Sequence, residues 1–186
     1  TIFTTEGKMQ WIKREAAAGV PQIQVGSFVP PKLLPQMADS AEVVRQSIQI
    51  PGLTVSALAP NLKGAQNAMA AGAHQVGVVM SVSEAHNMSN VRRSTQDSLD
   101  YFGRIVEYRD AHPQFKDTCL SGGMATAFGC TISGPVPLPD VMRIAEGLLK
   151  AGADRLSVAD TVGYANPGQV RDLFTELYRT VGTDIA

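Results

Sequence analysis

The fold class can be inferred from residues 151–163, which read AGADRLSVADTVG. Residues 139–151 have apolar side chains at helical spacing, and Gly152 suits the left-handed turn that ends a helix. Residues 155–159 are predicted to form a strand, followed by a polar turn. Residues 167–180 begin with proline, which is favoured in the first turn of a helix. The stretch therefore indicates a helix–strand–helix unit of an α/β protein.

The same alternation extends over the rest of the chain. Glycines at the same kind of joint recur at Gly19 and Gly72, each between a predicted helix and the next strand. The predicted strands are 20–25, 53–58, 74–80, a segment within 117–127, and 155–159. The predicted helices are 6–18, 40–49, 62–71, 94–112, 139–151 and 167–180. Five strands and six helices in strict alternation indicate a parallel sheet with helical crossovers.

Two architectures share this alternation, an open doubly wound sheet and a (β/α)8 barrel. No Gly-x-Gly-x-x-Gly follows the first strand, so a dinucleotide-binding sheet gains no support. Polar or glycine-containing stretches follow every predicted strand, as at the catalytic end of a barrel. We predict one domain over residues 1–186, the central part of a (β/α)8 TIM barrel that is incomplete in this chain. Ile185-Ala186 is predicted to begin another strand.

Composition limits the class of protein. Hydrophobic residues make up 44% of the chain, charged residues 18%, and the net charge is −1, all ordinary for a globular domain. No basic face suggests nucleic acid, and no apolar run is long enough to span a bilayer. Cys119 and Cys130 do not form a disulfide framework, so we predict a cytoplasmic protein.

Asp160 is the strongest candidate for catalysis. It follows an apolar strand and precedes Thr161 and Gly163. A carboxylate at the carboxyl end of a parallel strand can bind a metal-bound substrate or move a proton. An aspartate that holds the following turn is an equally good interpretation, and both stay open.

Five further residues are candidate substrate contacts. Ser27 and Gln24 lie toward the end of the first predicted strand, and Gln24 points inward if that strand alternates regularly. Asn61 follows the second strand, although capping the next helix is the favoured interpretation. Ser157 lies within the last strand. Cys130 is either a reactive thiol or, as we favour, a small buried residue.

A polar cluster of Glu84, His86 and Asn87 follows the third predicted strand. It is only loosely similar to a set of metal ligands, because no His-x-His or His-x-x-x-His pair is present. We predict a solvated loop there.

Several segments together resemble a known family. They are 26–32 (GSFVPPK) with 35–39 (PQMAD), 60–64 (PNLKG), 127–130 (AFGC) and 157–163 (SVADTVG). In order and spacing they resemble the 3-hydroxy-3-methylglutaryl-CoA lyase family of metal-dependent TIM-barrel lyases. The Asp-Thr-x-Gly segment is also similar to isopropylmalate and homocitrate synthases.

This resemblance implies a carbon–carbon lyase that uses Mg or Mn. Such an enzyme cleaves a 3-hydroxy-acyl-CoA to acetyl-CoA and a keto acid by a retro-Claisen reaction, as in leucine catabolism. It implies an active-site role for Asp160 and a substrate-side role for Ser157. Acyl-CoA is the implied partner, and a homodimer is a further expectation.

The chain departs from the family pattern in two ways. The family's Arg-Asp-Gly-Leu-Gln motif and its His-x-His ligand pair have no counterpart within residues 1–186, so the resemblance assigns no metal ligand to this chain. Gln24 stands where the family usually has glutamate, and Ser121, Gly122 and Gly123 replace Arg-Gly-Tyr-like residues. These differences bear on which acyl-CoA is bound.

Three hypotheses remain at this point. The first is the acyl-CoA lyase, and the second is a Claisen-type synthase that condenses an acyl-CoA with a keto acid. The third is a non-catalytic fragment or assembly module, motivated by the missing metal ligands.

Overall fold

The structure is a computed structural model that describes residues 2–182, which form two compact units. Unit 1 comprises Thr1–Val78 and Glu107–Cys119, and unit 2 comprises Val79–Val106 and Leu120–Ala186. The strand predicted to begin at Ile185-Ala186 lies outside the described residues.

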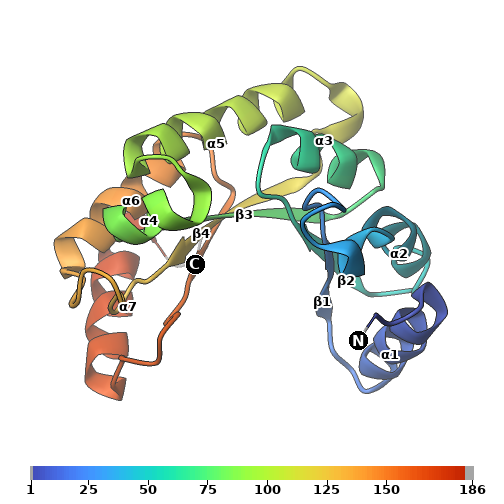
Figure 1. The fold of residues 1–186 in the computed structure, drawn as a ribbon, viewed down its shortest axis with the longest axis horizontal. Helices are drawn as coiled ribbons and strands as arrows, with labels where there is room; N and C mark the ends of the chain where they lie inside the picture. The colour runs from blue at the N-terminus through green and yellow to red at the C-terminus, as the bar shows by residue number, and fades with distance from the viewer. Residues whose placement is uncertain (1, 183–186) are drawn as a thin grey trace. The chain divides into compact units, whose positions relative to one another are not determined.

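Helices and strands alternate along the described residues (Figure 1), and the strand order β1-β2-β3-β4-β5 follows the order of the chain. The strands are β1 (Gln22–Ser27), β2 (Thr54–Leu58), β3 (Gln75–Ser81), β4 (Cys119–Ala125) and β5 (Arg155–Val158). The helices are α1 (Thr5–Ala17), α2 (Ser40–Ser47), α3 (Leu62–Ala70), α4 (Glu84–Val91), α5 (Thr95–Asp110), α6 (Leu138–Lys150) and α7 (Pro167–Val181). Two short 3₁₀ turns are η1 (Pro35–Met37) and η2 (Pro113–Phe115). All five predicted strands and all six predicted helices are confirmed, and α4 is an additional helix.

The glycine joints behave as predicted. Gly19, Gly72 and Gly152 have φ values of 92°, 90° and 97°, the left-handed region that side chains with a Cβ rarely enter. Each follows a helix and redirects the chain into the next strand. None of the helices in residues 2–182 combines the length and hydropathy needed to cross a bilayer.

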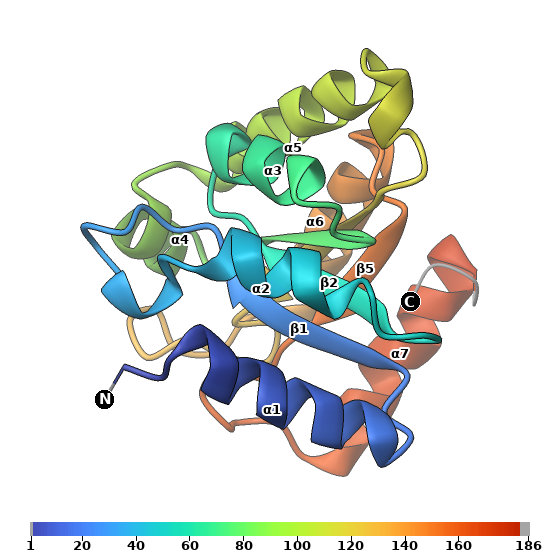
Figure 2. The ribbon, with the colours of Figure 1, turned by 90° about the vertical axis from the view of Figure 1, so that its right-hand side faces the viewer.

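In unit 1, β1 pairs with β2 and β2 pairs with β3, both parallel. Helices α1, α2 and α3 lie along these strands (Figure 2). Val43 and Val44 on α2 and Val55 on β2 are completely buried. Burying a valine side chain stabilises a fold by roughly 1.5–3 kcal/mol, so these residues anchor α2 against the sheet.

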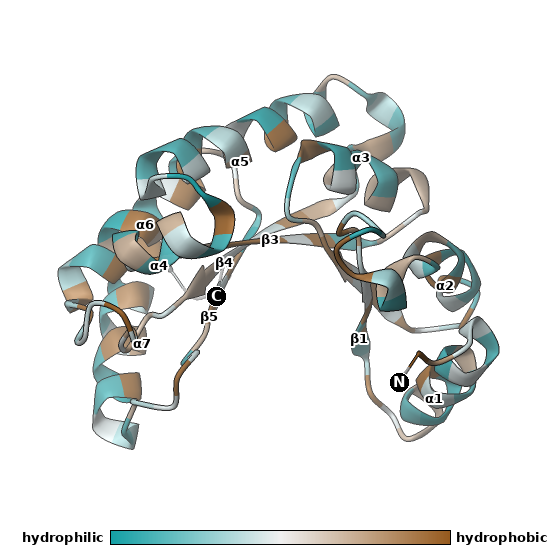
Figure 3. Ribbon diagram, viewed as in Figure 1, coloured by the Kyte–Doolittle hydropathy of each residue, from teal (hydrophilic) through white to brown (hydrophobic). Residues whose placement is uncertain are grey.

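In unit 2, β4 pairs in parallel with β5. Helix α6 has an apolar stripe, visible as brown bands in Figure 3, and buries Val141, Ile144 and Leu148. A Cβ on Gly122 would lie 2.8 Å from Leu148 Cδ1, so the absence of a side chain at position 122 allows Leu148 to pack closely against β4. Gly122 therefore does not prevent the strand, because Leu148 of α6 packs in the space that its missing side chain leaves.

Helix α4 contains the polar cluster for which a solvated loop was predicted, and that prediction is wrong. Asn87 is completely buried: its Oδ1 accepts a hydrogen bond from the Ser81 N–H at 2.9 Å. Its Nδ2 lies within donating distance of the Arg93 carbonyl (2.9 Å), the Ser94 carbonyl (3.0 Å) and the Ser98 hydroxyl (2.8 Å). The cluster thus joins the end of β3 to the start of α5.

Candidate active site

In unit 1, a β-bulge in β1 places Gln24 and Ser27 on the same face. The pairing passes from Gln24 opposite Ser56 to Gly26 opposite Ala57, so Val25 is an extra residue. A Cβ on Gly26 would lie 2.8 Å from the Ser40 hydroxyl, which means that position 26 faces α2. Ser27, the next residue, therefore faces away from α2, and because of the bulge Gln24 shares its face although the strand does not alternate regularly.

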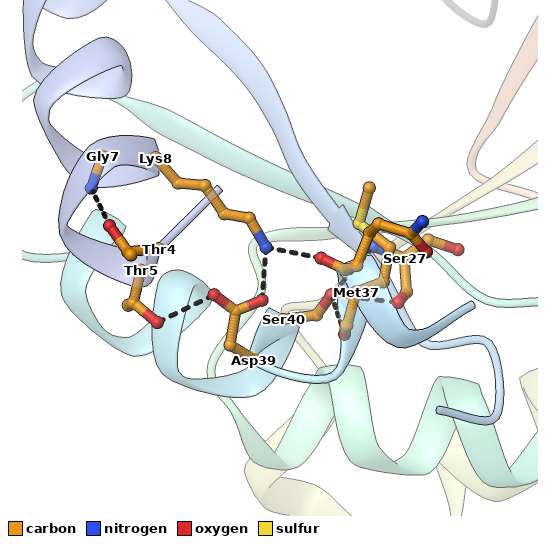
Figure 4. Close-up of polar contacts among 9 residues, drawn as sticks. Thr4, Thr5, Gly7, Lys8, Ser27, Met37, Asp39 and Ser40 are labelled. Carbon is orange, nitrogen blue, oxygen red and sulfur yellow. Dashed lines mark hydrogen bonds and ion pairs between the residues drawn. The ribbon is translucent and has the colours of Figure 1, made fainter. Parts of the chain in front are cut away.

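The end of β1 is fixed by Ser40, which sequence reasoning missed (Figure 4). The buried Ser40 hydroxyl accepts a hydrogen bond from the Ser27 N–H at 3.2 Å. It donates toward the carbonyl oxygens of Ser27 (3.0 Å) and Met37 (2.8 Å). One side chain thus joins the strand end to the loop that returns to α2.

An ion pair fixes the far end of this loop to α1 (Figure 4). Lys8 Nζ lies 2.5 Å from Asp39 Oδ1 and donates to the Gln36 carbonyl at 2.6 Å, while the Thr5 hydroxyl donates to Asp39 Oδ2 at 2.8 Å. Burial raises the pKa of Asp39, but the hydrogen bonds from Lys8 and Thr5 and the Lys8 charge outweigh it and lower the pKa. Asp39 is therefore an ionised structural carboxylate.

Asn61 caps α3, which was the favoured interpretation. Its Oδ1 accepts a hydrogen bond from the Gly64 N–H at 2.8 Å. The side chain also borders a pocket of about 510 Å³ lined in part by Phe28, Arg45 and Lys63. Because Asn61 borders this pocket, it could still contact a substrate, and that role stays a prediction.

In unit 2, Asp160 organises the loop after β5. Its Oδ1 accepts hydrogen bonds from the N–H groups of Gly163 (3.1 Å) and Tyr164 (3.0 Å), and Oδ2 accepts one from Ala165 (3.0 Å). The residue is exposed, and a carboxylate has about four acceptor positions, so three backbone bonds do not exhaust it. The turn-holding interpretation is thus confirmed, and a catalytic role stays a prediction.

Ser157 lies on β5 directly opposite Gly123 on β4. The neighbouring Leu156 is buried, whereas the Ser157 side chain is exposed on the opposite face of the strand. This orientation agrees with a substrate contact.

Cys130 is buried, as favoured from the sequence, but its thiol is unusual. Burial raises its pKa, whereas hydrogen bonds from the hydroxyls of Ser83 and Ser133 and from the N–H groups of Ser133 and Ile132 lower it more, to about 7. The Ile132 nitrogen lies 3.3 Å from Sγ. The surrounding donors therefore stabilise a thiolate.

Two threonine hydroxyls, those of Thr126 and Thr161, connect the strand ends of unit 2, and sequence reasoning missed both. The Thr126 N–H donates to the Thr161 hydroxyl oxygen at 2.7 Å, and the Ser83 N–H donates to Thr126 Oγ1 at 3.1 Å. Thr126 has a φ of 58°, which is uncommon for a β-branched residue. The only sequence signal was that hydroxyl residues recur after successive strands.

The Cys130 environment predicts how stability depends on pH. The folded-state pKa of about 7 lies below the ordinary value of 9.0, so the unfolded chain binds more protons between these values. The contribution is complete above about pH 9 and is lost as the pH falls through about 7. We expect the free energy of unfolding in urea to rise more from pH 7 to 9 for the wild type than for Cys130→Ser.

Cys119→Ser is the control for this measurement, because it removes the other cysteine thiol and leaves Cys130 and its hydrogen-bond donors in place. Equal pH dependence in the wild type and Cys130→Ser would contradict a thiolate at this position.

A Mg or Mn site of the implied kind requires several ligand side chains close together. Within residues 2–182 no three His, Cys, Asp or Glu side chains gather closely enough to hold a metal ion. The Asp39 carboxylate is bound by Thr5 and Lys8 of α1, and Asp160 accepts hydrogen bonds from N–H groups of its own loop. The described residues therefore do not by themselves fit a metal site.

The parallel strands, with hydroxyl, amide and carboxylate side chains at their carboxyl ends, define the class of α/β proteins whose sites lie at those ends. The chain belongs to the HMGL-like family, whose model matches residues 1–186.

Similar sequences and structures agree with this assignment. Hydroxymethylglutaryl-CoA lyase YngG of Bacillus subtilis is 35% identical over 94% of this chain and 57% of its own length. The 3-hydroxy-3-isohexenylglutaryl-CoA/hydroxymethylglutaryl-CoA lyase of Pseudomonas aeruginosa is 38% identical over 89% of this chain and 54% of its own length.

Among solved structures, the HMG-CoA lyase of B. subtilis aligns with a TM-score of 0.90 at 32% identity, covering all of this chain and 61% of that one. An HMG-CoA lyase from Acinetobacter baumannii, in complex with coenzyme A and 3-methylmalate, aligns with a TM-score of 0.89 at 33% identity, covering 97% and 58%. The prediction of an incomplete TIM barrel is thereby confirmed. The chain spans little more than half the length of these relatives.

Proposed function

We propose that the protein is an acyl-CoA lyase, which cleaves a 3-hydroxy-acyl-CoA to acetyl-CoA and a keto acid. The observation that carries the proposal is the family match over the whole chain, with TM-scores near 0.9 to HMG-CoA lyases. The polar side chains at the strand ends support the proposal. Ser157 and Ser27 face away from the helices of their own units, where they are free to contact a substrate.

The reaction requires a group that accepts the proton of the 3-hydroxyl as the carbon–carbon bond breaks. We assign this role to Asp160, whose carboxylate is held at the end of β5 by three backbone N–H groups. In this proposal Gln24, Ser27, Asn61 and Ser157 orient the acyl-CoA.

Cys130 is buried in the segment between β4 and α6. We propose that its hydrogen-bonded sulfur supports the substrate-binding loop that follows β4.

Dependence on Mg or Mn is part of the proposal, with ligands outside residues 2–182. A divalent metal would supply Lewis-acid chemistry to such a reaction. A cytoplasmic location and a homodimer likewise remain proposals.

The test is a cleavage assay on the protein, produced with whatever sequence flanks residues 1–186 in its gene. We expect release of acetyl-CoA from 3-hydroxy-3-methylglutaryl-CoA in the presence of Mg or Mn. Chelation with EDTA should lower the rate at least about 10²-fold, and added metal should restore it, since metal catalysis supplies several kcal/mol.

Other outcomes identify the alternatives. Condensation of acetyl-CoA with a keto acid, without cleavage, would mean a Claisen-type synthase. Absence of both reactions, with a folded protein and added metal, would mean a non-catalytic protein and would contradict the proposal.

A further inference from the structure

In unit 2, the apolar side chain of Val79 lies near Ser157 and has no role in the proposed reaction. Val79 on β3 is 39% exposed, a high value for a valine within a strand. It occupies the same face as Ser157, because a Cβ on Gly123 would lie 2.9 Å from Val79 Cγ2 and 3.3 Å from Ser157 Oγ. Val79 and Ser157 thus flank position 123.

This face is the one that the helices do not cover. Gly122, the preceding residue, faces Leu148 of α6, so Gly123 faces the opposite way. Gly123 itself is buried, and its φ is not positive. The backbone at position 123 therefore does not require glycine.

The absent side chain instead lets Val79 settle close to β4. An alanine at position 123 would push the Val79 methyl group outward, because real Cβ atoms do not approach neighbours to 2.9 Å. Gly123 thus sets how far Val79 projects next to the Ser157 hydroxyl. The residue at position 123 therefore controls how far the apolar Val79 side chain extends beside the polar Ser157 hydroxyl. Binding sites discriminate between alkyl groups of different size by apolar contacts of this kind.

We infer that Val79, with its position set by Gly123, determines the size of the alkyl group that the site accepts on C3 of the acyl chain. The inference rests on the proposed lyase function and goes beyond it. The 3-hydroxyl and carboxylate are recognised by polar groups such as Ser157, whereas the C3 alkyl group contacts Val79.

The experiment compares two substrates that differ only at C3, 3-hydroxy-3-methylglutaryl-CoA and 3-hydroxy-3-isohexenylglutaryl-CoA. The ratio of their kcat/KM values is measured for the wild type and for variants at positions 79 and 123. We expect Val79→Ala to raise the preference for the isohexenyl substrate about tenfold, and Val79→Leu to lower it by a similar factor, as methylene-sized changes do.

Gly123→Ala should also lower this preference, because it pushes Val79 outward. The double variant Val79→Ala/Gly123→Ala should restore the preference for the isohexenyl substrate, because it lacks the Val79 methyl groups that Gly123→Ala displaces. Val170→Ala on α7 is the matched control, since Val170 is similarly exposed at 37% and lies outside the proposed site. Its ratio should equal that of the wild type.

Each outcome has one meaning. A wild type that cleaves neither substrate contradicts the proposed function. A wild type that cleaves at least one, with ratios unchanged in Val79→Ala and Val79→Leu, overturns only the inference about Val79. Opposite shifts in these two variants, with thermal unfolding midpoints close to that of the wild type, would support it, because a packing defect does not alter specificity in opposite directions.

Discussion

Asp160→Asn should lower kcat/KM for acyl-CoA cleavage by about 10²-fold or more, which is the usual contribution of a general base. The substitution keeps the shape of the side chain and removes its charge. Oδ1 can still accept from Gly163 and Tyr164, but the amide NH₂ cannot accept the Ala165 N–H. The measurement is steady-state kinetics of the full-length protein with Mg or Mn added.

The control is Asp172→Asn, which makes the same chemical change at an exposed position on α7. Circular dichroism and limited proteolysis of the loop after β5 separate the two roles of Asp160. If Asp160→Asn loosens this loop yet retains activity within a few-fold of the wild type, Asp160 only holds the turn, and another residue accepts the proton.

Asn87→Ala should destabilise the protein by about 3 kcal/mol, because it leaves the buried Ser81 N–H without its acceptor and removes the donor shared by three oxygens. The loss is large because the side chain is completely buried and water does not replace it. Urea unfolding monitored by circular dichroism measures the change through the midpoint and slope.

Asn90→Ala is the matched control, since Asn90 lies on the same helix and is exposed. We expect that variant to change the free energy of unfolding by less than about 0.5 kcal/mol. If Asn87→Ala lowered the free energy of unfolding no more than Asn90→Ala does, the result would contradict a stabilising role of the Asn87 hydrogen bonds.

The sequence predicted the elements that bury apolar side chains and missed the one that does not. Helix α6 shows its stripe of valine, isoleucine and leucine directly in the sequence. Helix α4 buries Asn87 instead, so hydrophobic periodicity gives no signal for it. A short helix that is stabilised by side-chain hydrogen bonds is recognised only from the three-dimensional structure, where the bonded groups lie close together.

The candidate site shows the same limit. The sequence placed Asp160 and Asn61 at strand ends because position follows from the alternation. It did not show that three N–H groups converge on Asp160, nor that Ser40 holds Ser27, because those contacts depend on loop conformation. Regular elements are encoded by local patterns, whereas loop geometry is set by the tertiary fold.

The bulge at Val25 has a consequence for protein engineering. Residues three apart in a regular strand face opposite ways, so Gln24 and Ser27 can act together only if the extra residue is kept. Deleting Val25 would turn Gln24 and Gln22 toward the helices or force the strand to slip. A transplant of this motif into another barrel must therefore carry the backbone irregularity along with the side chains.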